Sequence, residues 1–379
     1  MIGPELERRA HRFVGAIGFT ARRNIEVLTE QNVTLAELDV VGVKFDETLK
    51  PDYVLVETSG GEKNFEDLLK LNSLSAFLPR CSVYYIGGNV STDIVRFAER
   101  LRIRAMHTSR LDELETELGV QKNAYFGSFS DSFETLTEKY SAVLYEKKHG
   151  DLLRARSSLW LETDPFFRLK RSRSILRQMA AELDKSEDQS LSQALEFLSA
   201  EFVLLYVVGI LEAAGELYAL PDHQREVIFK ERLIAGRISV REKEELMDRF
   251  YRFLVGYTRH LQRPMKIRRG DLKLTDPDET HLYDVISRSI RRAASSRVAP
   301  NILDILISSS FLEEHQKPLP RIGLPQESFD LEFVLKLIRD IVLPLFTTVQ
   351  PKFVKQISSV QAKEFGSIPR NSVISEISG

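Results

Sequence analysis

The chain has 379 residues, of which 28% are charged and 43% hydrophobic, and its formal net charge is −2. At about 100–200 residues per domain, this length predicts two or three domains, and the hydrophobic fraction suffices for buried cores. The single cysteine, Cys81, excludes an internal disulfide framework, and the seven histidines are too scattered for a zinc-finger spacing. The near-neutral total excludes a histone-like polycation but leaves room for local basic patches that bind nucleic acid.

Targeting and membrane signals are not expected. The N-terminal residues, MIGPELERRAHRF, are charged and lack the apolar core of a signal peptide. The most apolar run extends from Phe202 to Leu211 and is bounded by Glu201 and Glu212, whereas a membrane-spanning helix needs about 20 residues. We therefore expect a buried core helix here and a cytoplasmic protein without a membrane partner.

The first 118 residues alternate between helical and strand patterns. Helical spacing predicts helices at residues 5–17, 64–77, 93–101 and 111–118, and strand patterns predict strands at residues 22–28, 34–45, 53–58, 82–86 and 103–107. Gly18 fits the end of the first helix, and Ser91 or Thr92 can cap the third. Residues 1–120 are therefore predicted to form an α/β domain, a mixed sheet flanked by helices.

Strand signals fade after about residue 120. Helical periodicity covers residues 132–147, 166–184, 189–218, 241–262, 279–296, 301–313 and 328–346, which are separated by glycine and proline breakers. We expect an all-α C-terminal region over residues 121–363 that binds DNA or a partner. Residues 364–379 carry no pattern and predict a loose tail.

Two carboxylates fall at matched positions of two predicted strands. In a hairpin centred near Thr48, Asp39 and Glu57 are equally far from the turn. Antiparallel pairing in that register places them directly opposite each other, with Cβ atoms about 5 Å apart. Such carboxylates repel each other unless a cation neutralises them, and Mg²⁺ or Mn²⁺ prefers oxygen ligands of this kind. The alternative is a pair of solvated carboxylates at the edge of the strands.

The order of these elements resembles the PD-(D/E)XK restriction-endonuclease-like superfamily, most closely its Mrr-type and archaeal Holliday-junction-resolvase members. The resemblance covers roughly the first third of the chain and rests on the order of short, degenerate motifs. The matching pieces are Gly18-Phe19, Leu38-Asp39-Val40-Val41, Val54–Ser59, Ser82–Ile86, Ala98–Ile103 and Leu111–Leu114. The resemblance implies a restriction-endonuclease-like fold and a metal-dependent DNA endonuclease that hydrolyses phosphodiester bonds. It also implies a homodimer and a role in restriction or antiviral defence.

The resemblance assigns roles to a few residues. Asp39 and Glu57 would hold Mg²⁺ or Mn²⁺, and Glu7 in the first helix would be an auxiliary metal ligand. A metal-bound water would then attack the phosphate in line. The lysine that the family carries two residues after the glutamate is replaced here by Ser59.

A catalytic lysine could instead come from the helix that follows. Lys63, at its start, is the first candidate, and Lys70 is the second. The alternative is a decayed nuclease-like scaffold whose helical half binds a protein or nucleic-acid partner in a defence or repair complex. An RNA-cleaving effector is a third hypothesis. Its signature would be aromatic side chains that stack on bases, but Tyr84 and Tyr85 fit a sheet core better.

Basic residues gather in three clusters of the C-terminal half. These clusters comprise Arg168, Lys170, Arg171, Arg173 and Arg177, then Arg263, Lys266, Arg268, Arg269 and Lys273, and finally Arg288, Arg291, Arg292 and Arg297. Such clusters neutralise nucleic-acid phosphates, although a solvated helix face is the alternative for any one of them. We expect nucleic-acid contacts from Arg168, Lys170, Arg171, Arg268 and Arg269, and from Arg22 and Arg23 on the strand before the site.

Overall fold

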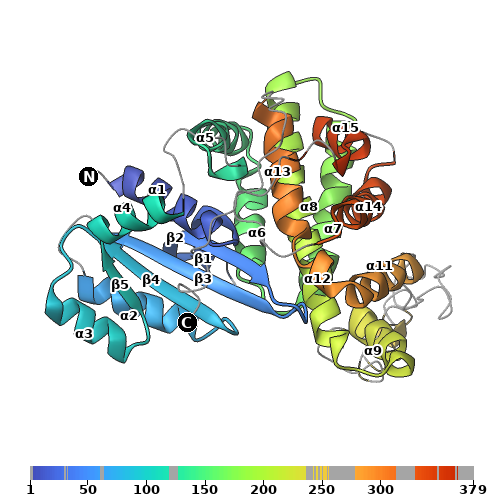
Figure 1. Cartoon of the computed structure of the whole chain (residues 1–379). Coiled ribbons are helices and arrows are strands. Elements are labelled where there is room, and N and C mark those ends of the chain that lie inside the picture. The colour runs from blue at the N-terminus through green and yellow to red at the C-terminus, as the bar shows by residue number, and fades with distance from the viewer. Residues whose placement is uncertain are drawn as a thin grey trace.

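The computed structural model describes residues 3–29, 31, 33–59, 64–118, 127–235, 278–312, 329–347, 350–362 and 365, with isolated residues between 242 and 255. It consists of a five-stranded mixed sheet flanked by helices, followed by a helix-rich C-terminal region (Figure 1). This is the predicted fold class. Lys63, Arg268, Arg269, most of the predicted helix 241–262 and nearly all of the predicted tail lie outside the described residues.

The N-terminal elements follow the predicted order, with ends within three residues of those expected. They are α1 (Gly3–Ala16), β1 (Thr20–Leu28), β2 (Thr34–Phe45), β3 (Pro51–Ser59), α2 (Asn64–Ser75), β4 (Cys81–Gly87), α3 (Thr92–Arg100), β5 (Arg104–His107) and α4 (Thr108–Glu117). Helix α1 ends where Gly18 adopts a φ of 92°, a conformation that favours glycine. Ser91 caps α3, because its side chain accepts a hydrogen bond from the Ile94 amide at 3.3 Å.

The strands are arranged in the order β1-β2-β3-β4-β5. The first three form an antiparallel meander, and β3, β4 and β5 run parallel. Helices α1 and α4 lie on one face of the sheet and α2 and α3 on the other (Figure 1). Leu6 and Phe13 of α1 share a core with Val40 and Val56 on the first face. On the second face, α2 packs on β3 and β4.

The helix-rich region contains more helices than its periodicity indicates. It comprises η1 (Gly127–Phe129), α5 (Asp131–Glu146), α6 (Gly150–Trp160), α7 (Pro165–Leu183), α8 (Gln189–Tyr218), α9 (Asp222–Ala235), α11 (Glu279–Arg291), α12 (Ala293–Ser296), α13 (Ala299–Leu312), α14 (Leu331–Val342), η3 (Leu343–Leu345) and α15 (Lys352–Ser359). Helices α6, α9 and α15 were not predicted. The buried face of α6 includes Arg156 and Ser157, and these polar residues obscure its apolar period.

Helix α8 is the centre of the molecule. By length and composition alone this 30-residue helix could cross a membrane, but 94% of its apolar window is buried among the other elements. Leu204 and Leu205 of α8 belong to the same hydrophobic core as Leu55 of the sheet. The apolar run is therefore a core segment, as predicted, and the sheet and the helices share one interior.

Arg22 joins the sheet to α8 and α13, and this corrects its expected contact with nucleic acid. Its side chain is only 5% exposed. Its Nε and Nη2 atoms donate to both carboxylate oxygens of Glu201 at 2.7–2.9 Å, and Nη2 also donates to Asp304 Oδ1 at 2.7 Å. The Nη1 atom donates to Ser128 Oγ at 3.0 Å. A guanidinium with its donors engaged in the interior is not available to a nucleic-acid backbone.

Arg168 is a second buried arginine, and its predicted nucleic-acid contact is corrected for the same reason. It forms an ion pair with Glu212 of α8 and donates from Nε to the Leu159 carbonyl at 2.9 Å. The hydroxyl of Tyr53 on β3 donates to the same Glu212 carboxylate. Arg168 is therefore part of a link between α7, α8 and β3 rather than of a basic surface.

Replacing Arg22 with alanine is expected to destabilise the fold strongly. The Arg22→Ala variant leaves Glu201 and Asp304 buried without their cation, which costs about 3–5 kcal/mol in comparable buried pairs. Urea unfolding measures the loss, and Arg171→Ala, at an exposed position of α7, should change stability by less than about 0.5 kcal/mol. Equal stability of the two variants would contradict the structural role of Arg22.

Candidate active site

Strands β2 and β3 pair in the register that the sequence predicts for a hairpin centred near Thr48. Strands β2 and β3 pair from Phe45↔Pro51 to Val40↔Val56, and the next pair in this register is Asp39 and Glu57. The turn between them is organised by Asp46, whose Oδ1 accepts hydrogen bonds from the Thr48 amide at 2.8 Å and the Lys50 amide at 3.0 Å. This Asx turn holds the register that brings the two carboxylates to neighbouring positions.

Asp39 uses one carboxylate oxygen in the fold. Its Oδ2 accepts from the backbone amide of Thr58 at 2.6 Å and from the Thr58 hydroxyl at 2.8 Å. Burial raises the pKa of Asp39, the two bonds from Thr58 lower it, and the charge of Glu7 raises it further. No hydrogen bond to the second oxygen, Oδ1, comes from any residue that the structure describes. Sequence reasoning missed Thr58, whose only signal was its place directly after Glu57.

Glu57 is the most strongly perturbed carboxylate of the site. Its side chain is 8% exposed, and Oε1 accepts from Lys70 Nζ at 2.5 Å. The other oxygen, Oε2, is buried and has no hydrogen-bond partner among the described residues. Burial and then the negative charge of Asp39 raise the pKa of Glu57 to about 8, against the opposing effect of Lys70.

Lys70 supplies the positive charge of the site. Helix α2 carries it across the sheet face, where Nζ donates to Glu57 Oε1 and, at 2.8 Å, to the Glu37 carbonyl. A lysine ammonium has three donors, so one is not used by the residues that the structure describes. Of the two lysine candidates, only Lys70 can be placed, because Lys63 lies outside the described residues.

The donor set suits a hard divalent cation. Asp39 and Glu57 each keep one oxygen that the described part of the fold does not use, and the one on Glu57 is already desolvated. Within the described ranges, no three or more His, Cys, Asp or Glu side chains are grouped so as to hold a metal ion. A bound Mg²⁺ would therefore keep several waters and complete its shell with substrate oxygens, which is its usual arrangement in proteins.

The other expected site residues are engaged elsewhere or remain at the surface. Glu7, the expected auxiliary ligand, forms an ion pair with Arg23, although its charge still acts on Asp39. Arg23 also pairs with Glu134. A substrate phosphate would therefore have to compete with Glu7 and Glu134 for the Arg23 guanidinium. On α7, Arg171 is exposed and Lys170 is partly exposed.

No family model, curated protein or solved structure that was compared with the chain matches it.

Stability should respond to pH through Glu57. Because its folded pKa is raised to about 8 from 4.5, the folded state holds a proton that the unfolded chain releases, so stability falls as pH rises through this interval. The Glu57→Gln variant removes this slope and gains stability relative to the wild type by at most about 1.4 kcal/mol per pH unit.

Unfolding free energies measured between pH 5 and pH 8 test this expectation, the interval being set by the two pKa values. Glu66→Gln, at an exposed position of the same helix α2, is the matched control and should follow the wild type. Parallel pH profiles for Glu57→Gln and the wild type would contradict the raised pKa.

Proposed function

We propose that this protein is a metal-dependent nuclease of the restriction-endonuclease-like type, which hydrolyses phosphodiester bonds in DNA. The single observation that carries the proposal is the cross-strand pair Asp39 and Glu57, in which each carboxylate keeps one oxygen that no described residue uses, beside the ammonium of Lys70. The order of elements around the pair, an antiparallel hairpin followed by parallel strands, supports the same superfamily resemblance.

In the proposed mechanism the carboxylates bind the metal and the lysine contacts the phosphate. The free oxygens of Asp39 and Glu57 would bind Mg²⁺ or Mn²⁺, which supplies a Lewis acid and a nucleophilic water for attack on the phosphate. Thr58 fixes Asp39 by its amide and hydroxyl. Lys70 fixes Glu57 and directs its remaining donor toward a phosphate oxygen, where a positive charge stabilises the negative charge that develops in the transition state.

Lys70 can take the place of the missing family lysine. Positions 57 and 59 lie on the same face of β3, so a lysine at position 59 would bring its ammonium beside Glu57. Ser59 cannot do this, but Lys70 delivers an ammonium to Glu57 Oε1 from α2, at 2.5 Å. The charge is thus supplied by the helix instead of the strand.

The remaining parts of the proposal rest on the resemblance. They are a homodimer that cuts both strands and a role in restriction or defence against foreign DNA. The proposed cytoplasmic location rests instead on the charged N-terminal residues and the short apolar run, and the burial of α8 inside the fold supports it.

Cleavage assays with Mg²⁺ or Mn²⁺ test the activity on duplex DNA, single-stranded DNA and RNA. Asp39→Asn, Glu57→Gln and Lys70→Met should each lower the rate by at least about 100-fold, because each removes a ligand or a charge acting on the transition state. Lys336→Met, at an exposed position of α14, should retain wild-type activity. Cleavage that survives chelation of the metal, or that is unchanged in Glu57→Gln, would contradict the proposal.

The second candidate is a non-catalytic nuclease-like scaffold that binds a partner through its helical half. It is favoured by Ser59 and by the contact with Lys70 that already occupies Glu57 Oε1. In this case no nucleic acid is cut with either metal, and the Glu57→Gln variant retains partner binding.

A further inference from the structure

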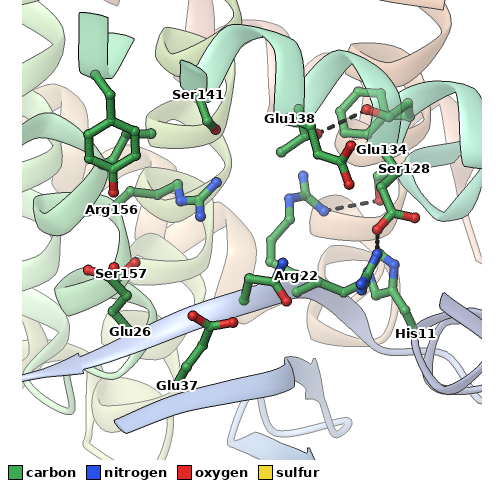
Figure 2. Close-up of a pocket in the computed structure, with 16 residues that line it drawn as sticks. His11, Arg22, Glu26, Glu37, Ser128, Glu134, Glu138, Ser141, Arg156 and Ser157 are labelled. Atoms are coloured by element: carbon green, nitrogen blue, oxygen red, sulfur yellow. Dashed lines mark hydrogen bonds and ion pairs between the residues drawn. The ribbon is translucent and has the colours of Figure 1, made fainter. Parts of the chain in front are cut away.

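A polar cavity lies between the sheet and the helical half, apart from the candidate active site. It has a volume of about 260 Å³ and opens between the edge strand β1 and helices α5 and α6. Figure 2 shows Arg22 and Glu26 of β1 on one side, Ser141 of α5 on another, and Arg156 of α6 at the wall. Because drug-sized ligand pockets measure about 300–1,000 Å³, a cavity of this size suits a small metabolite.

Arg156 is the exceptional residue of this cavity. The structure describes six buried arginines, and five of them pair with a carboxylate, namely Arg9, Arg12, Arg22, Arg168 and Arg173. The sixth, Arg156, is 8% exposed and forms no hydrogen bond or ion pair with any described residue, and its buried Nε has no acceptor. Its guanidinium points from α6 into the cavity, below Ser141 and on the side that faces Arg22 (Figure 2).

The nearby carboxylates do not neutralise Arg156. Glu201 acts on it through charge, but both Glu201 oxygens accept from Arg22. Glu26 also acts on Arg156 through charge but forms no ion pair with it in the described structure, and the charge of Arg22 opposes both carboxylates. Burial accordingly lowers the pKa of Arg156 despite the charge of Glu201. A buried cation without a partner is costly, and a bound anion removes that cost.

The cavity wall offers the remaining groups of an oxyanion site. Ser141 and Ser157 contribute hydroxyl donors to its lining, whereas the Thr137 hydroxyl already donates to the Phe133 carbonyl at 3.0 Å. An arginine fork beside such donors matches a carboxylate or a phosphate, whose oxygens accept two parallel hydrogen bonds.

The cavity also carries acids, and these restrict the ligand. Glu26 and Glu37 stand directly opposite each other in the β1–β2 pairing and both line the cavity, as does the exposed Glu138. Like charges so placed repel each other. A ligand with an amino or hydroxyl group at this end relieves the repulsion, whereas a polyanion such as a nucleic-acid strand increases it.

We propose that this cavity binds a small metabolite that carries a carboxylate or phosphate group, held by Arg156, and an amino or hydroxyl donor directed at Glu26 and Glu37. The site is distinct from the nuclease centre and does not depend on its activity. The two sites are nevertheless neighbours, because Lys70 donates to the carbonyl of Glu37, whose side chain lines the cavity.

Thermal unfolding and calorimetry of the full chain test the proposal with two probes, inorganic phosphate and acetate, in a buffer free of other oxyanions. At least one probe should raise Tm saturably at millimolar concentration, which sodium chloride of equal ionic strength should not do. The responding probe identifies whether the site selects phosphate or carboxylate. No saturable response to either probe would overturn the proposal.

Three variants locate the binding. Arg156→Met should weaken binding by about tenfold or more, since it removes a charge-assisted contact, whereas Arg154→Met on the same helix should bind as the wild type does.

The stability of the ligand-free variant is a second test. In the absence of an oxyanion, Arg156→Met should be at least as stable as the wild type, since it loses an uncompensated buried charge. Ser141→Leu fills the cavity while Arg156 stays in place, and it should also abolish binding. Wild-type binding by Arg156→Met or Ser141→Leu, or a stability loss in Arg156→Met equal to that in Arg22→Ala, would refute the site.

Discussion

Two buried glutamates of α8 hold the sheet against the helices. Glu201 and Glu212 are separated by about three helical turns and therefore lie on the same side of α8. Glu201 binds Arg22 of β1, and Glu212 binds Arg168 and the hydroxyl of Tyr53 on β3. Because a buried charge without its partner is so unfavourable, the sheet docks on α8 where Arg22 reaches Glu201, and the Tyr53 hydroxyl there reaches Glu212, whose charge Arg168 of α7 neutralises.

This docking also secures the hairpin that carries the candidate site. The turn between β2 and β3 approaches α8 at Gly215, where an added Cβ atom would lie 2.2 Å from the Leu49 carbonyl oxygen. One end of the hairpin is thus fixed on the core helix, and the register runs from there to Asp39 and Glu57 at the other end. The Asx turn and the close approach to α8 thus support the register in which the carboxylates are adjacent.

Buried charges in this molecule fall into two groups. Those of Arg22 and Arg168 are neutralised by the fold and join elements together. Glu57 Oε2 and Arg156 Nε are buried without hydrogen-bond partners in the described structure, and Arg156 lines a cavity. The ligands that we propose for these two groups are a cation for Glu57 and an anion for Arg156, whereas the paired charges of Arg22 and Arg168 have a structural role.

The sequence by itself determined the order of helices and strands in the first third, the limits of β2 and the pairing of Asp39 with Glu57. It could do so because these features depend on local periodicity and on distances along the chain from one turn. It could not determine which lysine reaches Glu57, or that Arg22 and Arg168 are internal. A basic residue has the same local pattern whether its partner is water, phosphate or a glutamate 179 positions away, as Glu201 is from Arg22. Only tertiary packing decides which charges find partners, because it brings together residues distant in sequence and removes the water that would otherwise solvate them.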